Sequence, residues 1–399
     1  MQAWQCEDAA SNEKQVETRR FQCLHRAGPS PEVRGVGWLL NHVPHRRPVA
    51  IPTMIAMRTI TFPSTCLVLV LLSVSLHSAA QGQEKDRSNI ASVNTMNRQA
   101  MEGRRGHLSI DRTIQDVLVH PAFAGFGRLM LPWDDPNVDV NMRLSDIRTL
   151  LTYHTEVNPS DVVSALNQMI DDANSGRAIF YDFYTGAQKQ ADSTKENTEL
   201  FFFRGQPGAP FAIVCPGGGF SYVASVHEGF PYAVEISKSG YNVFVLRYRA
   251  GLGGAVATQD LAAAISYVFR NAKTLGVGVG NYSLWGSSAG ARMAASIGTH
   301  GVAFYGGDAL PRPSVVVMAY TAHSEYSSED PPTFVVVGEQ DGIAPPYVME
   351  RRVSALRAAG IPVEFHKFKT LGHGFGLGTG TSAEGWIRRA IRFWEEFMN

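Results

Sequence analysis

Short apolar runs and longer amphipathic stretches alternate along residues 176–399. The run Phe211–Cys215 is apolar throughout, which is typical of a strand buried on both faces of a sheet. Regular alternation of strands and helices predicts an α/β fold, with a mostly parallel central sheet and helices on both of its faces. The other predicted strands are 242–248, 282–285, 314–320, 333–337 and 363–368, and the predicted helices are 230–239, 259–275, 289–297, 346–359 and 382–398.

Two aromatic-rich runs, 178–185 and 199–204, precede the apolar run 211–215 and flank a charged connection. Such a pair predicts two antiparallel strands at the edge of the sheet. Further upstream, residues 107–175 place apolar side chains at helical spacing in three stretches, and Asn158 with Pro159 is a start signal for the last of them. We therefore expect a helical N-terminal extension, which either packs on the main domain or covers the active site as a cap.

Residues 57–80 combine the features of a secretory signal peptide. A basic start leads into an apolar run that is short for a membrane span, and Ala80 closes a group of small residues suited to cleavage. We expect a secreted or periplasmic protein without stable membrane insertion after cleavage, and an uncleaved anchor is the alternative. The polar residues 81–106 predict a flexible leader. Residues 1–56 predict a disordered upstream extension foreign to the native protein, whose translation then begins at Met57 or, alternatively, at Met54.

Composition narrows the classes of function. The 399 residues are 44% hydrophobic, and 36 Lys and Arg balance 36 Asp and Glu, so no basic excess points to nucleic acid. After cleavage at Ala80 only Cys215 of the four cysteines remains, which excludes an internal disulfide and a cysteine zinc site in the mature chain. Nothing in the composition indicates an oligomeric state.

The segment Gly286-Ser287-Ser288-Ala289-Gly290 joins a predicted strand to a predicted helix. A serine between glycines at such a junction is typical of a nucleophile on a tight, strained turn, where its hydroxyl is open to substrate. We predict Ser288 as this nucleophile. Because these residue types are common, the motif can also arise by chance. Whether it is functional depends on whether an oxyanion hole, an acid and a base occur in the expected order along the chain.

The sequence contains candidates for the oxyanion hole, the acid and the base in the expected order. Three glycines, 217–219, come directly after the strand 211–215, where backbone N–H groups can form an oxyanion hole; a plain flexible turn is the alternative. Asp341 follows the strand 333–337 and could accept a hydrogen bond from the Nδ1–H of a histidine, thereby fixing the tautomer. His373, framed by glycines after the last predicted strand, is the predicted base. The competing acids are Glu339, Asp330 and Asp308, and the competing histidines are His366 and His323.

The order of glycine-rich loop, Gly-x-Ser-x-Gly, Asp and His resembles the α/β-hydrolase fold over about residues 176–399. Within it, Cys-Pro-Gly-Gly-Gly-Phe at 215–220, His-Glu-Gly at 227–229 and Leu-Arg-Tyr-Arg at 246–249 resemble secreted esterases related to acetyl-xylan esterases and to the hormone-sensitive-lipase group. Pro216 departs from the lipase group, which has histidine there. The resemblance implies Ser288 as nucleophile, His373 as base, Asp341 as orienting acid, and the amides of Gly218 and Ala289 as oxyanion hole, with Gly219 able to replace Gly218.

We therefore expect an exported serine esterase that hydrolyses carboxylic esters through an acyl-enzyme, acting on a small-molecule or carbohydrate ester such as an acetylated sugar. We expect no metal and no organic cofactor, because the segments 276–280 and 374–378 do not complete a dinucleotide motif and His227-Glu228 lacks the second histidine of a metalloprotease motif. The pair His227-Glu228 is expected to line the pocket or to cap the following helix. The alternatives are a peptidase or another hydrolase on the same fold, and a catalytically silent binding protein.

Overall fold

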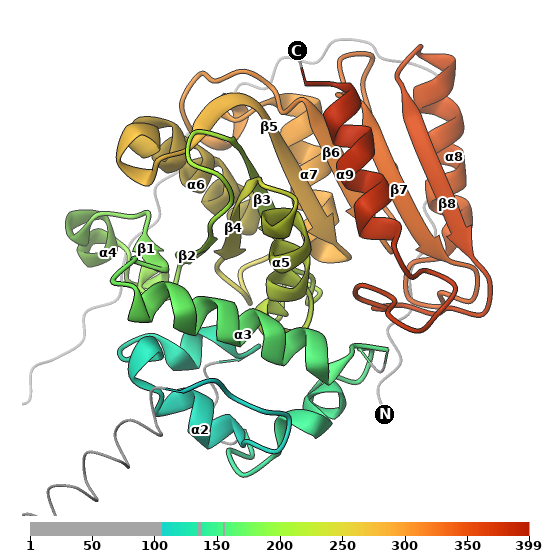
Figure 1. The fold of residues 1–399 in the computed structure, drawn as a ribbon. Coiled ribbons are helices and arrows are strands. Elements are labelled where there is room, and N and C mark those ends of the chain that lie inside the picture. The colour runs from blue at the N-terminus through green and yellow to red at the C-terminus, as the bar shows by residue number, and fades with distance from the viewer. Residues whose placement is uncertain (1–105, 134–137, 155, 399) are drawn as a thin grey trace, which may run out of the picture. The chain divides into compact units, whose positions relative to one another are not determined.

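The computed structural model describes residues 106–133, 138–154 and 156–398, and these contain an eight-stranded sheet (Figure 1). The strand order is β1-β2-β4-β3-β5-β6-β7-β8. β1 pairs antiparallel with β2, and β2 pairs antiparallel with β4, whereas the six strands β4-β3-β5-β6-β7-β8 run parallel to one another. The bounds are β1 (Phe180–Asp182), β2 (Glu199–Phe203), β3 (Pro210–Cys215), β4 (Asn242–Arg247), β5 (Gly278–Ser287), β6 (Val315–Ala319), β7 (Thr333–Gly338) and β8 (Val363–Phe368). This is the topology of an α/β-hydrolase, and it confirms the predicted fold class and the antiparallel edge pair.

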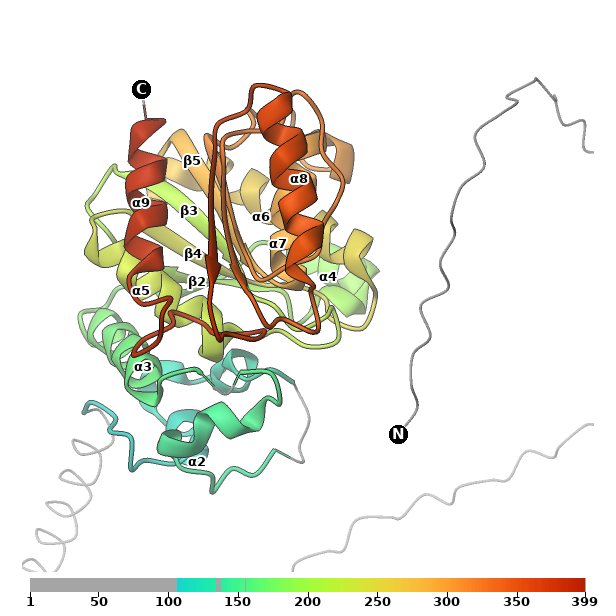
Figure 2. The ribbon, with the colours of Figure 1, turned by 90° about the vertical axis from the view of Figure 1, so that its right-hand side faces the viewer.

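Helices cover both faces of the sheet, as Figure 2 shows. One face carries α5 (Phe230–Lys238) and α9 (Trp386–Glu396). The opposite face carries α6 (Gly254–Leu275), α7 (Ala289–His300) and α8 (Pro346–Ala358). The mostly parallel sheet is therefore shielded from solvent on both sides, which is the arrangement that the apolar strands predicted.

Alternate side chains of the central strands enter two separate hydrophobic clusters. In β4, Val243 and Val245 join the cluster under α5 and α9, whereas Phe244 and Leu246 join the cluster under α6 and α7. Successive residues of a strand point to opposite faces, so a strand covered on both sides must be apolar at every position. Each such side chain stabilises the fold by about 1.5–3 kcal/mol when it is fully buried.

Three predicted elements begin more than one or two residues away from their predicted starts. β5 begins at Gly278 instead of 282, and α6 begins at Gly254 instead of 259. Glycines at both starts carry no side chain, so the apolar pattern begins only after them. α9 begins at Trp386 instead of 382, because Gly385 adopts a left-handed conformation (φ 80°) directly before the helix.

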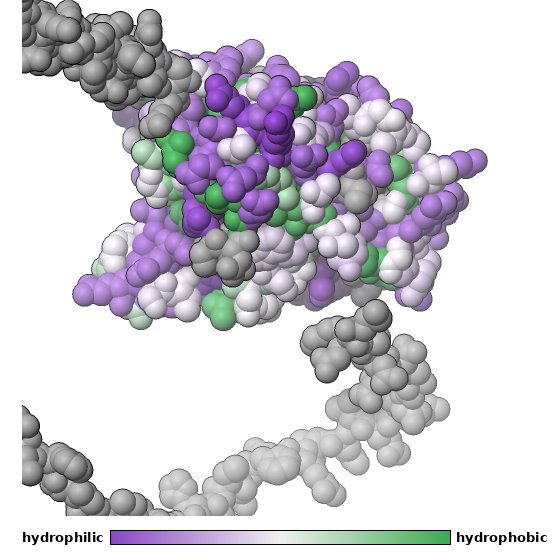
Figure 3. Space-filling view, turned by 90° about the horizontal axis from the view of Figure 1, so that it is seen from below, coloured by the Kyte–Doolittle hydropathy of each residue, from purple (hydrophilic) through white to green (hydrophobic). Residues whose placement is uncertain are grey.

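The N-terminal extension contains one long helix and several short turns. In α3 (Pro159–Asn174), the Asn158 side chain accepts a hydrogen bond from the Ser160 amide, as the start signal predicted, and the helix packs against α5. The first two predicted helical stretches form only short pieces, because Pro121 follows α2 closely and the second stretch winds as a 3₁₀ helix. The remaining helical elements are α2 (Ile114–Leu118), η1 (Pro121–Phe123), η2 (Gly127–Met130), η3 (Leu144–Leu150), α4 (Gly186–Ala191), η4 (Ser193–Lys195), η5 (Ser225–Gly229) and η6 (Ala303–Tyr305). Figure 3 views the molecule from the side of α2, where hydrophobic residues lie in small groups among hydrophilic ones.

The predicted signal segment 57–80, the upstream residues 1–56 and the leader up to residue 105 lie outside the described residues. Within the part of the chain that the structure describes, none of the helices is long and apolar enough to cross a bilayer. The signal peptide therefore stays a prediction from the sequence.

Candidate active site

Ser288 occupies the sharp junction between β5 and α7. Its backbone has φ 49° and ψ −117°, a conformation that non-glycine residues rarely adopt and that costs about 1–3 kcal/mol. The flanking glycines allow this turn because a Cβ at Gly290 would lie 1.9 Å from the carbonyl oxygen of Cys215, and one at Gly286 would lie 2.4 Å from the Ala291 nitrogen. The start of α7 therefore lies so close to the ends of β3 and β5 that only glycine fits at positions 286 and 290.

The predicted acid and base lie in line with Ser288. His373 Nε2 is 2.9 Å from Ser288 Oγ, and His373 Nδ1 is 2.8 Å from Asp341 Oδ2. An ionised carboxylate only accepts hydrogen bonds, so Nδ1 is the donor and Nε2 is left to accept the hydroxyl proton. The Asp341 side chain is fully buried and that of His373 is 8% exposed, which shields this hydrogen-bonded chain from water.

Two backbone amides fix the orientation of the Asp341 carboxylate. The amides of Ile343 and Ala344 donate to Asp341 Oδ1 at 2.9 and 2.7 Å. The other oxygen, Oδ2, is thereby directed at the imidazole of His373. The loop after β7 thus positions the acid through its own backbone.

The competing acids and histidines have other surroundings. Asp330 pairs with Arg352 at 2.6 Å in a buried contact, Asp308 pairs with Arg270, and Glu339 is exposed at the end of β7. His366 contacts Glu364 at 2.6 Å, and the Nε2 atom of His323 is buried without a hydrogen-bond partner among the described residues. Of the predicted candidates, the structure brings together Ser288, Asp341 and His373.

The glycine loop lies beside Ser288. A Cβ at Gly217 would be 3.0 Å from the Cβ of Ser288, so the loop and the serine are in direct contact. The amides of Gly218, Gly219 and Ala289 donate to no acceptor among the described residues, whereas the Gly217 amide donates to Glu228 at 2.7 Å. Ala289 is also the first residue of α7, where the helix dipole favours negative charge. These three amides are available to a developing oxyanion.

The hydrogen-bond partners of Glu228 were not predicted from the sequence. The pair His227-Glu228 is buried in η5 and gives α5 no side-chain cap, so of its two expected roles the helix cap is wrong. Glu228 Oε2 accepts from the Gly217 amide and from the Ser287 hydroxyl. An acid between apolar residues, here Val226 and Phe230, is the one sequence signal that could have indicated a buried carboxylate.

The ionisation of this buried pair is strongly perturbed. Burial raises the pKa of Glu228, but His154 and the hydrogen bonds from Ser287 and Gly217 outweigh it and hold the pKa at about 2. Burial, together with the charge of His154, lowers the pKa of His227 to about 3, while its Nε2 atom lies 3.0 Å from the Ile147 carbonyl oxygen. Glu228 is therefore an anion and His227 a neutral ring at neutral pH.

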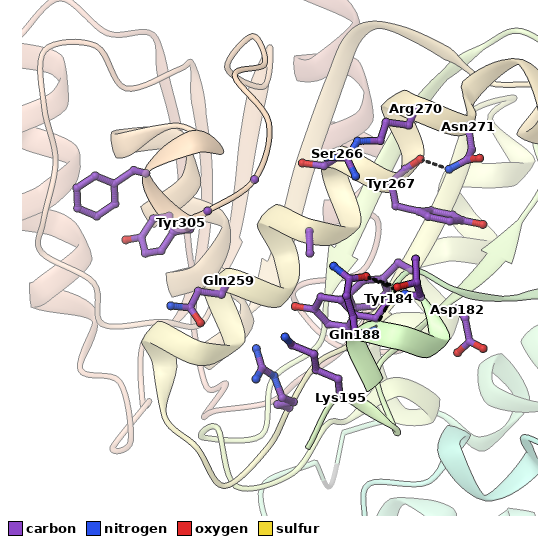
Figure 4. A pocket seen from close by; sticks show the side chains of 17 residues that line it. Asp182, Tyr184, Gln188, Lys195, Gln259, Ser266, Tyr267, Arg270, Asn271 and Tyr305 are labelled. Atoms are coloured by element: carbon purple, nitrogen blue, oxygen red, sulfur yellow. Dashed lines mark hydrogen bonds between the residues drawn. The ribbon is translucent and has the colours of Figure 1, made fainter. Parts of the chain in front are cut away.

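A cavity of about 810 Å³ lies elsewhere, between α4, α6 and η6 (Figure 4). Ser288, Asp341 and His373 are absent from its lining. Its Tyr184 hydroxyl donates to Asp260 at 2.7 Å, and the same carboxylate pairs with Arg249 at 2.8 Å. These contacts join the segments around Tyr184 and Arg249 to Asp260 of α6, so they have a structural role. In the described ranges, no three His, Cys, Asp or Glu side chains gather closely enough to hold a metal ion.

Two family models match the amino-acid sequence in adjacent segments. Residues 204–308 match the BD-FAE model, and residues 311–399 match the prolyl oligopeptidase family. The first segment contains the glycine loop and Ser288, and the second contains Asp341 and His373. The acetylxylan esterase of Xylanibacter ruminicola is 23% identical over 210 residues, which are 45% of this chain and 43% of that enzyme. The chain has the α/β-hydrolase fold and resembles esterases built on it. The match spans less than half the length of that enzyme.

Solved structures of similar layout include three hydrolases. MGS-M1, an α/β-hydrolase enzyme from a Medee basin deep-sea metagenome library, is 26% identical, with a TM-score of 0.44 over 50% of this chain and 92% of that chain. The acetyl ester-xyloside bifunctional hydrolase from Caldicellulosiruptor lactoaceticus is 24% identical, with a TM-score of 0.45 over 51% and 89% of the two chains. The carboxylesterase Cest-2923 from Lactobacillus plantarum is 20% identical, with a TM-score of 0.45 over 51% and 94%.

Proposed function

We propose that this chain is an exported serine esterase. The observation that carries the proposal is the unbroken hydrogen-bonded chain from Asp341 through His373 to Ser288. A hydroxyl in contact with an imidazole, which is itself oriented by a buried carboxylate, is the arrangement that activates serine for acyl transfer. Export is supported by the signal-like residues 57–80.

The proposed reaction has two balanced halves. His373 Nε2 takes the hydroxyl proton while Ser288 Oγ bonds to the ester carbonyl carbon, and the carbonyl electron pair moves onto oxygen. The amides of Ala289 and of Gly218 or Gly219 hold this oxyanion, and the loss of one such donor typically costs about 2.7–4 kcal/mol of barrier. Collapse breaks the ester C–O bond, and the alcohol leaves with the proton from His373. In the second half, water bonds to the acyl carbon while His373 Nε2 takes its proton; the bond from that carbon to Ser288 Oγ then breaks, Oγ takes the proton from His373, and the acid is released.

The substrate that we propose is an acetyl ester of a carbohydrate. This assignment is supported by the similarity to the acetylxylan esterase of Xylanibacter ruminicola. A series of p-nitrophenyl esters of increasing acyl length, run beside acetylated xylan, tests it. Preference for acetate and release of acetate from xylan are expected, and a preference for long acyl chains would contradict the substrate assignment.

The Ser288→Ala variant tests the mechanism. We expect its kcat for p-nitrophenyl acetate to fall by about 10⁶-fold, to the small residual rate that the oxyanion donors and substrate binding supply, because no other hydroxyl contacts His373 Nε2 among the described residues. A fluorophosphonate probe, which loses fluoride as it bonds to the activated serine, should label the wild-type chain and not the variant. Ser239→Ala removes an exposed serine at the end of α5 and is the matched control. A wild-type chain that resists the probe would instead support the silent binding protein.

A peptidase is the second candidate. The match of residues 311–399 to the prolyl oligopeptidase family favours it, because this segment supplies both Asp341 and His373. Dipeptidyl p-nitroanilides with proline next to the leaving group distinguish the two candidates. Cleavage of these amides at a rate comparable with p-nitrophenyl acetate would favour the peptidase over the esterase.

A further inference from the structure

A buried carboxylate ties the glycine loop to the turn that carries Ser288. Glu228 is 0% exposed, and its Oε2 atom accepts from the Gly217 amide at 2.7 Å and from the Ser287 hydroxyl. Gly217 precedes the two glycines whose amides are free, and Ser287 precedes Ser288. A single carboxylate oxygen therefore bridges the loop and the turn, which also touch directly because the Gly217 amide lies 3.1 Å from the Ser287 hydroxyl oxygen.

The second oxygen of Glu228 is held by two distant elements. Oε1 accepts from the Tyr320 hydroxyl at 3.0 Å and lies 2.7 Å from His154 Nε2, which must donate because the carboxylate only accepts. His154 belongs to the N-terminal extension, and its side chain is only 4% exposed. The ring of Tyr320 packs edge-on against His373, with 5.3 Å between the ring centroids. The same group of side chains therefore reaches the base as well as the glycine loop.

The saturation of this carboxylate argues for a role in geometry. Glu228 has four partners, two on each oxygen, and they come from four separate parts of the chain. A buried ion pair is often no more stabilising than well-packed apolar side chains of similar volume, whereas it fixes positions narrowly. Hydrogen-bond donors for an oxyanion act only when they are held in place before the reaction.

We propose that Glu228 is a positioning residue for the glycine loop and Ser288, and that His154 of the N-terminal extension holds Glu228 in that position. The extension would then help to hold the active site in shape through His154. This inference rests on the proposed esterase function, because the quantity that Glu228 would control is the turnover of an ester.

Two substitutions of Glu228 separate positioning from charge. Glu228→Met keeps the length and removes all acceptors, so we expect kcat for p-nitrophenyl acetate to fall about 100-fold or more, the size of effect seen when an oxyanion donor is lost. KM should change less than about threefold, because the ground-state ester does not yet carry the oxyanion. Glu228→Gln should stay within about tenfold of wild-type kcat, since its carbonyl can accept from Gly217 and its amide can donate to Tyr320 and His154, which can both switch to accepting.

Substitutions of His154 test the extension separately. His154→Gln retains an N–H donor and should keep most of kcat, whereas His154→Leu retains none and should lower kcat by about tenfold, midway toward the loss of an oxyanion donor. The matched control is Asp330→Leu, which breaks the buried pair with Arg352 away from the site. We expect it to lower the midpoint of thermal unfolding while kcat stays within about twofold of wild type, as for a residue with a purely structural role.

The outcomes are distinct. A folded Glu228→Met chain with wild-type kcat overturns the positioning role, and wild-type kcat in His154→Leu overturns the part assigned to the extension. If Glu228→Met does not fold, the two His154 variants test the inference instead. Equal kcat in His154→Leu, His154→Gln and wild type would then contradict it. Failure of the wild-type chain to hydrolyse esters or to react with a fluorophosphonate instead contradicts the proposed function. Slow but complete labelling of the Glu228 variants would show that Ser288 remains reactive, and thus that only its surroundings have changed.

Discussion

Replacement of Asp341 by asparagine should remove nearly all activity without disturbing the fold. Asp341 Oδ1 accepts two backbone amides, at 2.9 and 2.7 Å. In Asp341→Asn the side-chain oxygen must remain at this position, because an NH₂ group there would face two N–H donors. The NH₂ group therefore points at His373 Nδ1, which then has to accept, and the ring proton moves to Nε2.

In that tautomer the ring cannot take the proton of Ser288, although Nε2 stays 2.9 Å from Oγ. The expected loss is about 10⁴-fold in kcat, as in other triads with this change, which corresponds to about 5 kcal/mol of barrier. The assay is the hydrolysis of p-nitrophenyl acetate at pH 7, with thermal unfolding measured in parallel. Asp330→Asn is the control for a buried acid outside the site. A loss below tenfold in a folded Asp341→Asn chain would refute the assignment of Asp341 as the orienting acid.

Two further predictions concern the frame of the site. Gly290→Ala places a Cβ 1.9 Å from the Cys215 carbonyl oxygen, so we expect at least about 1–3 kcal/mol of destabilisation and a large loss of kcat, measured by urea unfolding and ester hydrolysis; a stable, fully active variant would contradict the tight turn. His227 should destabilise the fold in acid, because burial lowers its pKa from 6.5 to about 3. Its contribution to the free energy of unfolding is complete above pH 6.5 and is lost as the pH falls toward 3, by about 1.4 kcal/mol per pH unit. Urea unfolding between pH 6.5 and 4.5 should show a shallower slope in His227→Gln, whose amide can still donate to the Ile147 carbonyl, and an unchanged slope would exclude His227 as the cause.

The sequence predicted the central strands well because a strand covered on both faces must be apolar at every position. It predicted the starts of β5 and α6 poorly, since Gly278 and Gly254 carry no side chain that could reveal a period. The order of Ser288, Asp341 and His373 was readable because each follows a predicted strand. The distances between these three side chains were not readable, because they depend on how the strands pair.

Glu228 escaped prediction for a different reason. In the sequence it stands beside a histidine and a glycine, and such a residue usually faces solvent. Its burial depends on His154, which is 74 residues upstream, and on Tyr320, which is 92 residues downstream. Local pattern carries no information on partners that only the tertiary fold brings together.

The contacts of the N-terminal extension limit how far the protein can be shortened. Arg247 donates to the carbonyl oxygens of Leu129 and Leu131, and His154 contacts Glu228. Recombinant production of residues 176–399 alone would remove these contacts from Arg247 and Glu228, although all eight strands and the predicted reacting groups would be present. Anyone who trims this chain to its sheet should therefore expect an aggregation-prone product. Because Ile114 and Val117 of α2 are also buried in the hydrophobic cluster, a shortened version should retain α2.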